Sequence, residues 1–167
     1  MAYLFLVRSM RTIRPIAISD ISETFRVRTA TDENRLTSAQ LTALGITESS
    51  VSEKLLGSYK GWLCEEQGSV IGFAIGDRSS GEMWVIAVLP GHIGRGIGGA
   101  LLEKVEAWFF SEGCSELWLT TDLDTRLRAY SFYKKHGWSD WKIEKGLRYM
   151  RKKSNQSLQP TAGGSDV

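Results

Sequence analysis

The amino-acid sequence predicts an α+β (three-layer α/β) domain with a mixed, mostly antiparallel central sheet of six to seven strands, flanked by about four helices. Three apolar segments between residues 61 and 89, separated by short polar turns, have the pattern of successive antiparallel strands. Two amphipathic segments follow, and each lies between strand-like segments. Five glycines within residues 91–99 connect the third strand to the first of these helices.

The composition is that of a globular protein and excludes several other classes. At 167 residues the chain has the length of one domain, and an apolar fraction of 42% with six tryptophans argues against disorder. A formal net charge of +2 favours neither nucleic acid nor a membrane surface as a partner. No apolar run approaches the roughly 18 residues of a membrane-spanning helix.

Two features indicate a reducing compartment. Cys64 and Cys114 are far apart and have no CxxC motif or histidine at metal-ligand spacing, which favours buried free thiols. The opening segment "MAYLFLV" lacks the charged residues that precede the apolar run of a signal peptide. We therefore expect a cytoplasmic protein.

The first third of the chain is predicted to be mostly helical. Residues 12–20, "TIRPIAISD", are expected to form a short strand, and Ser19 or Asp20 is expected to cap a helix over residues 21–30. A turn-rich stretch then leads into a second helix over residues 51–60.

The middle of the chain contains the three antiparallel strands. They are predicted at "GWLCEEQ" (61–67), "VIGFAIGD" (70–77) and "MWVIAVL" (83–89). The third strand is apolar at both alternating sets of positions, which predicts a strand buried on both faces at the centre of the sheet.

The C-terminal half alternates helices and strands. An amphipathic helix around residues 101–109 is expected to end near Gly113. It is followed by a strand at 116–122, a helix at 125–137 and one or two strands at 138–153.

Composition also sets the expected domain boundary. We expect one domain over residues 1–152 and a disordered tail over 153–167, which is rich in Gly, Ser and Gln. The tail weakly resembles the read-through ends of integron gene cassettes, and this resemblance suggests an accessory gene.

The glycine-rich stretch "PGHIGRGIGGALL" joins a buried strand to the start of a helix, and three interpretations compete. A tight turn needs only one or two glycines. Gly94, Gly96 and Gly99 match the dinucleotide pattern G-x-G-x-x-G, but the preceding antiparallel strands are not a dinucleotide-binding βαβ unit. The third interpretation is an anion cradle, in which backbone N–H groups and the positive helix end hold a phosphate and Arg95 adds a contact.

Two motifs together resemble one known family. "VLPGHIGRGIGGALL" is similar to the acyl-CoA-binding motif of the Gcn5-related N-acetyltransferases, and "RAYSFYKKHGW" is similar to their later R-A-x-x-F-Y-x-x-x-G-F motif, at the correct separation. The resemblance covers residues 12–152. Ile93 replaces the usual Gln or Arg of the first motif, and Arg126 replaces the usual Asn of the second.

This resemblance implies a binding site for acetyl-CoA. The central strand and the next one would splay apart, so that pantetheine contacts the exposed backbone of the central strand. The residues implied in cofactor binding are Ala87, Val88, Ile93, Gly94, Arg95, Gly96, Ile97, Gly98, Gly99, Arg126 and Tyr133. Of these, Gly99 is expected to permit close helix packing, and no metal is expected.

The implied reaction is direct transfer of an acetyl group from acetyl-CoA to a primary amine in a ternary complex. Since an alkylammonium must lose a proton before it attacks, a general base is needed, and we expect Glu82 or Asp122, acting directly or through water. Tyr133 aligns with the family tyrosine that protonates the leaving thiolate, and Tyr130 is the alternative. His92 and His136 are expected to be structural.

The acceptor is not identified by the sequence. Residues 25–59 and Trp84 are expected to line its side of the cleft, but the mixture of Arg26, Arg28 and nearby acids does not name a substrate. A small-molecule or peptide amine is expected, and homodimers occur in the family. Two alternatives stay open: a non-catalytic acyl-CoA-binding or sensor domain of the same fold, and an NAD-binding protein.

Overall fold

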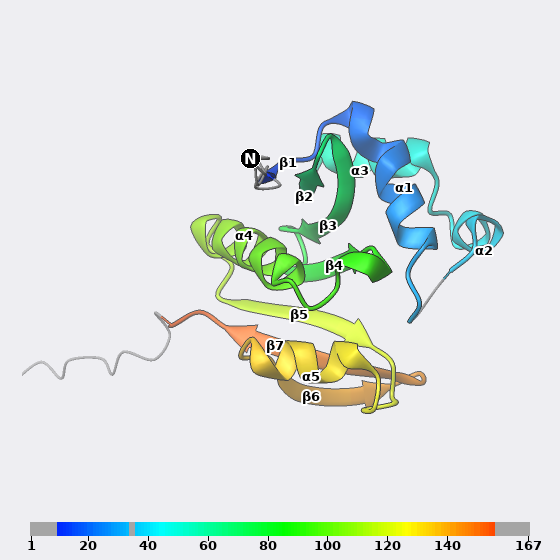
Figure 1. The fold of residues 1–167 in the computed structure, drawn as a ribbon. Coiled ribbons are helices and arrows are strands. Elements are labelled where there is room, and N and C mark those ends of the chain that lie inside the picture. The colour runs from blue at the N-terminus through cyan, green and yellow to red at the C-terminus, as the bar shows by residue number, and fades with distance from the viewer. Residues whose placement is uncertain (1–9, 34–35, 156–167) are drawn as a thin grey trace, which may run out of the picture.

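A computed structural model describes residues 10–33 and 36–155. In these ranges the chain forms a seven-stranded sheet of order β1-β2-β3-β4-β5-β7-β6. Figure 1 shows its two parts, with β1 to β4 above and β5, β7 and β6 below. The segment "MAYLFLV" and all but the first residues of the expected tail lie outside the described residues.

All neighbouring strands pair antiparallel except β4 and β5, which are parallel. The strands are β1 (Arg11–Pro15), β2 (Tyr59–Glu66), β3 (Ser69–Asp77), β4 (Glu82–Val88), β5 (Glu116–Thr121), β6 (Ser139–Glu144) and β7 (Leu147–Lys153). The helices are α1 (Ile21–Thr29), α2 (Ser38–Ala43), α3 (Glu48–Leu56), α4 (Ile97–Ser111) and α5 (Arg128–Lys135). The mixed, mostly antiparallel sheet predicted from the sequence is confirmed.

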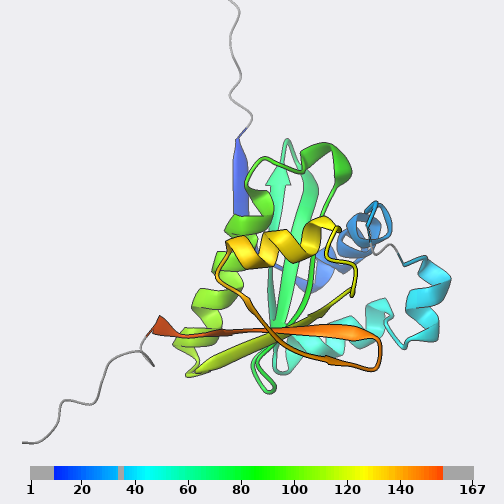
Figure 2. The same ribbon diagram turned by 90° about the horizontal axis from the view of Figure 1, so that it is seen from below.

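Helices cover both faces of the sheet and create two apolar clusters. On one face, α4 and α5 pack against the sheet through a core that includes Leu101, Phe109 and Trp138. On the other face, α1 and α3 cover β2 to β4 through residues such as Val27 and Phe73. Figure 2 shows α4 and α1 on opposite sides of the strands β2 and β3, with α5 crossing in front of them. The two faces are called here the α4 face and the α1 face.

The centre of the sheet opens between β4 and β5. Only Glu82 and Trp118, near the start of the two strands, are paired across this boundary. Beyond this point the strands separate, so the second half of β4 has one backbone edge that β5 does not use. The splay implied by the family resemblance is therefore present.

A β-bulge at Trp84 precedes this opening. Ile75 pairs with Val85 and Gly76 with Met83, so Trp84 is the extra residue of β4. As a result, Trp84 and Val85 both pack on the α1 face, whereas Met83 lies on the α4 face. Successive side chains of a strand point to opposite faces, so Glu82, the neighbour of Met83, points towards the α1 face as well.

Several local predictions need correction. The structure has five α-helices in its described residues, because Thr37 and Gln40 form a capping box that starts the additional helix α2. The helix expected over residues 51–60 is α3, which begins after a Thr47 cap and ends at Leu56, since the chain enters β2 at Tyr59.

The expected cap of α1 is also different. Asp20 occupies the cap position, but its carboxylate accepts hydrogen bonds from Arg14 and from the N–H of Ala17. The expected tail begins one residue too early, because β7 extends to Lys153. Finally, β4 is central but only half-buried at most of its side chains, since it borders the opening.

Neither cysteine of the described residues forms a disulfide; Cys64 is buried and Cys114 is half-buried. Burial raises the pKa of both thiols. Among the helices described, none has the length and apolar character needed to cross a membrane.

Candidate functional site

The free edge of β4 supplies the first part of the candidate site. Leu89 donates its N–H to the carbonyl of Ile71 on β3 at 2.9 Å. Because hydrogen-bond direction alternates along a strand, the N–H and C=O groups of Ala87 also point to β3, while those of Ile86 and Val88 point to the opening. This geometry fits the role predicted for Val88, but it turns the backbone of Ala87 away from the gap.

The glycine-rich loop follows the end of β4 directly. A short 3₁₀ helix, Pro90–His92, is followed by Gly94 and Gly96, whose φ angles of 80° and 78° lie in the left-handed region that favours glycine. A Cβ added at Gly91, Gly94 or Gly96 would meet no atom within 4 Å. The loop is therefore an open backbone surface and not a tightly packed turn.

The loop ends at the N-terminus of α4, a helix of 15 residues. Its first intrahelical hydrogen bond runs from Ala100 N–H to the Gly96 carbonyl at 3.1 Å. The N–H groups of Ile97, Gly98 and Gly99 precede that bond and are available, together with the positive end of the helix dipole, for an anion.

Side chains in this segment do not all face the loop surface. Ile93 is 37% exposed, whereas Ile97 is buried in the core of the α4 face, so only its backbone can meet a ligand. A Cβ at Gly98 would lie 3.3 Å from the Phe132 ring, and one at Gly99 would lie 2.8 Å from Nε2 of His136. The last two glycines therefore allow α5 to approach α4.

The two arginines predicted to contact the cofactor are both held by acids. The Arg95 guanidinium donates two hydrogen bonds to the carboxylate of Glu66 on β2, at 3.0 and 2.7 Å. It also lies 2.8 Å from Nδ1 of His92, so His92 is part of this cluster. Arg126 is 88% exposed and forms a bidentate pair with Asp124.

Tyr133 lies on the inner face of α5 and is 8% exposed. Its ring packs edge-to-face against Phe132 and Trp138. Its hydroxyl has no hydrogen-bond partner among residues 10–33 and 36–155, and burial raises the pKa of the phenol, which keeps it protonated. The alternative Tyr130 instead donates to Asp140 at 3.1 Å and faces the Arg148 guanidinium.

The two candidate bases have different environments. Glu82 is half-buried on the α1 face, and burial, together with the nearby Asp77 carboxylate, raises its pKa, whereas Lys54 opposes the rise. Asp122 follows β5 and is exposed, and its Oδ1 accepts the N–H of Asp124 at 2.8 Å. Asp122 therefore stabilises its own turn.

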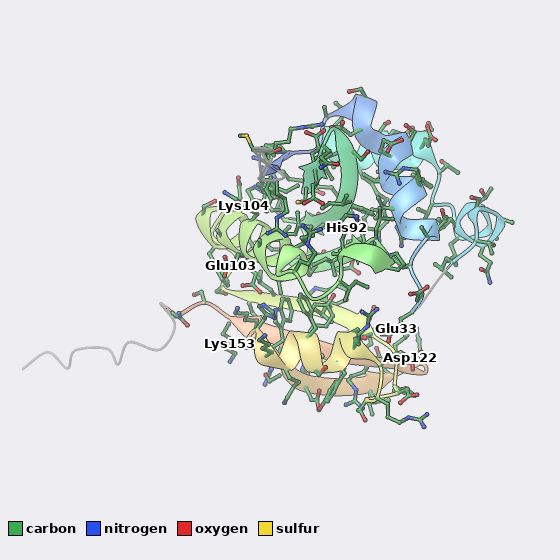
Figure 3. The ribbon with its side chains drawn as sticks, viewed as in Figure 1. Glu33, His92, Glu103, Lys104, Asp122 and Lys153 are labelled. Atoms are coloured by element: carbon green, nitrogen blue, oxygen red, sulfur yellow. The ribbon has the colours of Figure 1, made fainter. Side chains whose placement is uncertain are left out.

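One contact joins the two parts of the molecule beside the opening. The carboxylate of Glu33, which follows α1, accepts a hydrogen bond of 2.9 Å from the backbone N–H of Arg128, the first residue of α5. The same carboxylate lies 3.4 Å from Nε of Arg128. Figure 3 labels Glu33 and Asp122 on the side of the molecule where β5 ends. The sequence analysis did not single out Glu33, because nothing in the sequence signals a contact across 95 positions.

The sequence did not single out Ile86 and Lys54, both of which lie close to the opening. The bulge at Trp84 reverses the alternation of β4, so Glu82 and Ile86 lie on opposite faces of the sheet, whereas regular alternation would place them on the same face. The family motif points to the end of β4, but it carries no information about which backbone groups β3 already uses. Lys54 had no signal, because it belongs to a helix 28 residues before β4.

A splayed mixed sheet with a glycine-rich loop at the start of a helix defines the class of N-acetyltransferase folds. A family model described as "Acetyltransferase (GNAT) family" matches residues 28–138, about two thirds of the sequence. The chain therefore belongs to the GNAT family of acetyltransferases, as its motifs predicted. No curated protein matches the sequence significantly.

Solved structures show the same fold at low sequence identity. The PaiA N-acetyltransferase of Thermoplasma acidophilum, in complex with coenzyme A, has a TM-score of 0.76 and 18% identity over 87% of this chain and 99% of its own. The ribosomal-protein-S18-alanine N-acetyltransferase of Escherichia coli has a TM-score of 0.68 and 19% identity over 90% and 99% of the two chains.

Proposed function

We propose that the protein transfers an acetyl group from acetyl-CoA to a primary amine by direct attack in a ternary complex. The observation that carries this proposal is that the candidate proton donor and the candidate base lie on opposite faces of the opening between β4 and β5. The phosphate-binding surface and Tyr133 lie on the α4 face. Glu82 and Trp84 lie on the α1 face.

The residues fit acetyl-CoA better than a dinucleotide. The diphosphate would bind the N–H groups from Gly94 to Gly99, where a Cβ at Gly94 or Gly96 would meet open space. The pantetheine amides would hydrogen-bond to the free backbone edge at Ile86 and Val88. Ile93 loses the side-chain donor of the family motif, but the backbone donors remain.

The arginines have a smaller role in this proposal than the sequence predicted. The Arg95 guanidinium is bound to the Glu66 carboxylate, which largely compensates its charge and leaves it less free to contact a phosphate. Arg126 is paired with Asp124, so it does not replace the missing asparagine of the second motif.

Acetyl-CoA supplies the reactive thioester, and the protein supplies proton transfer at both ends. Glu82, directly or through water, accepts a proton from the acceptor ammonium, which frees the nitrogen lone pair. A new N–C bond forms while the C–S bond breaks, and the N–H of Ile86 or Val88 stabilises the charge on the carbonyl oxygen. Tyr133 gives its proton to the departing sulfur, and the nitrogen loses its second proton through water, which returns a proton to the Tyr133 phenolate.

The raised pKa of Glu82 suits this role, since a base is most effective when its pKa approaches the working pH. We propose Glu82 as the base and not Asp122, because Asp122 lies in an exposed turn. The acceptor is a small-molecule or peptide amine, and a cytoplasmic location and a single domain over residues 1–152 are further parts of this proposal.

Ligand-dependent stabilisation followed by an activity screen tests the function. Acetyl-CoA at 100 times its Kd should stabilise the protein by about 2.7 kcal/mol, and NAD should not. A panel of amines with free-thiol detection should then reveal turnover. Stabilisation by acetyl-CoA without turnover on any amine would favour the sensor alternative, and stabilisation only by NAD would refute acyl-CoA binding.

A further inference from the structure

Two cationic side chains share one aromatic ring on the α1 face, at the point where the sheet opens. The guanidinium carbon of Arg28, from α1, lies 5.2 Å from the centroid of the Trp84 ring. The ammonium of Lys54, from α3, lies 5.7 Å from the same ring and 4.7 Å from the ring of Tyr59. Tyr59 and Trp84 themselves pack edge-to-face with centroids 5.5 Å apart.

In the described residues neither cation forms an ion pair, although the charge of Lys54 acts on the nearby Glu82 carboxylate. In the described part of the chain, no side-chain or backbone acceptor forms a hydrogen bond with the Arg28 guanidinium or the Lys54 ammonium, and no carboxylate lies within ion-pair distance of either. Arg28 is half-buried, and burial lowers its pKa. Its guanidinium nitrogens are not fully buried, so water solvates them in the free protein and the carboxylate of a ligand can replace that water.

The arrangement differs from that of other arginines in the chain. Arg14, Arg26 and Arg95 each pair with a carboxylate. Arg28 projects from the same helix as Arg26, yet its guanidinium lies over the ring of Trp84, the residue of the bulge. Stacking on an aromatic ring holds a guanidinium in place while its outward N–H groups stay available for a planar anion.

We propose that the acceptor amine carries a carboxylate, which Arg28 binds with support from Lys54 while Trp84 packs against the body of the acceptor. Both cations lie over the Trp84 ring, 5.2 and 5.7 Å from its centroid, so an acceptor carboxylate bound beside this ring would meet them together. Two carboxylates, Glu82 and Asp77, also lie near the opening, and Ser58, Ser79 and Ser80 hold the Asp77 carboxylate by hydrogen bonds.

This inference rests on the proposed function, because it names the class of acceptor used at the same site. A polyamine would meet the positive charges of Arg28 and Lys54 and should be a poor acceptor. An amino acid or a short peptide presents both the amine and the carboxylate.

The first test compares pairs of amines that differ only in the carboxylate, using the full-length protein saturated with acetyl-CoA. The pairs are lysine with cadaverine, phenylalanine with 2-phenylethylamine, and dipeptides with their C-terminal amides; phosphoethanolamine with ethanolamine represents phosphate, and spermidine represents a polycation. In the pair that is acetylated fastest, the carboxylate should raise kcat/KM at least tenfold, a typical effect of a charged hydrogen bond.

Substitutions of Arg28 and Lys54 test whether these two cations cause the preference for a carboxylate. Arg28→Met should abolish it by raising KM tenfold or more with kcat changed less than threefold, and Lys54→Met should weaken it. Arg28→Lys keeps the charge and should retain part of the preference, which also covers the case in which Arg28→Met fails to fold. Lys60→Met is the matched control, since Lys60 lies over the Trp62 ring at 5.2 Å.

A binding experiment separates this inference from the proposed reaction. The CoA-saturated protein is titrated calorimetrically with N-acetyl amino acids and N-acetyl dipeptides, and with the corresponding amides. Carboxylate-selective binding that Arg28→Met removes supports the subsite even if no amine is turned over. The inference is overturned by equal use of both members of each pair, by preference for phosphoethanolamine or spermidine, by a carboxylate preference that survives Arg28→Met, or by absence of both turnover and carboxylate-selective binding.

Discussion

Trp138 donates its indole N–H to one carboxylate oxygen of Glu106 at 2.8 Å, while the other oxygen accepts a hydrogen bond from the Lys152 ammonium at 2.7 Å. Lys152 also donates to the carbonyl of His136 at 2.7 Å. This group joins α4, the end of α5 and β7, and it holds the helix that carries Tyr133 against the core.

Replacing Glu106 should therefore destabilise the protein. Glu106→Gln retains an acceptor for Trp138 but leaves the Lys152 ammonium without its acid, so we expect a loss of about 1–3 kcal/mol in the free energy of unfolding. Urea denaturation measures this loss. Glu103→Gln, on an exposed position of the same helix (Figure 3), is the control and should change stability by less than about 0.5 kcal/mol. Equal stability of the two variants would contradict the role of Glu106.

The contact between Gly99 and His136 predicts a second effect on stability. A Cβ at position 99 would lie 2.8 Å from Nε2, and the His136 ring is held by its Nδ1 contact with the Phe132 carbonyl at 2.8 Å. Although alanine is the better helix former, Gly99→Ala should destabilise by about 1–2 kcal/mol because the ring or α5 must move. Gly91→Ala meets open space and should be nearly neutral.

Tyr133→Phe tests the proton donor. The substitution keeps the ring contacts with Phe132 and Trp138 but removes the hydroxyl. We expect kcat to fall about a hundredfold or more, while the Kd for acetyl-CoA changes less than twofold. Stopped-flow kinetics and calorimetry measure the two quantities. An unchanged kcat would remove Tyr133 from the mechanism, and Tyr130→Phe would then be the next variant.

The pH dependence of the reaction distinguishes the two candidate bases. Because burial raises the pKa of Glu82 and only the ionised form accepts a proton, kcat/KM should fall as pH decreases through a pKa above 4.5, the ordinary value for glutamate. Glu82→Gln should lower the plateau and remove this acidic limb. Asp122→Asn should leave the limb in place. The opposite result would make Asp122 the base.

Stability at low pH tests the pair of Arg14 and Asp20. Hydrogen bonds from Arg14 at 2.7 and 2.9 Å hold the pKa of Asp20 below its ordinary 3.8. A depressed acid pKa stabilises the folded state above the unfolded pKa, and this stabilisation is lost as pH falls through the folded pKa. Asp20→Asn should therefore lower the free energy of unfolding at pH 7. The loss should be only about 1 kcal/mol, because Arg14 is partly exposed. Near pH 2 the variant and the wild type should be equally stable. Asp124→Asn, whose partner Arg126 is almost fully exposed, should show no such change.

The position of the candidate cofactor site could be predicted because it is encoded by local chemistry. Gly94 and Gly96 occupy left-handed conformations that few other residues adopt, and the helix behind them has an amphipathic pattern of its own. Such features depend on neighbours in the sequence. The helix α2 was missed because its capping box lies inside a polar stretch that also fits a loop.

The arrangement around the opening could not be predicted in the same way. The bulge at Trp84 is a property of the pairing between β3 and β4, and one extra residue is enough to move Glu82 to the other face. Likewise, the engagement of Arg95 by Glu66 depends on a contact between positions 29 residues apart.

The sequence by itself determined the fold class, the order of the strands along the chain, the family and the surface suited to phosphates, because periodicity, glycine placement and two motifs are all local. Only the tertiary structure decided which backbone groups of β4 remain free, which acid lies beside the opening, and which cation has no partner. Arg26 and Arg28 are equivalent in the sequence, and they differ because Arg26 donates hydrogen bonds to Glu23 and to the carbonyl of Val70, whereas the Arg28 guanidinium lies over the Trp84 ring. Contacts between distant parts of the chain, and not the residue type, decide whether an arginine pairs with an acid or keeps its hydrogen-bond donors available.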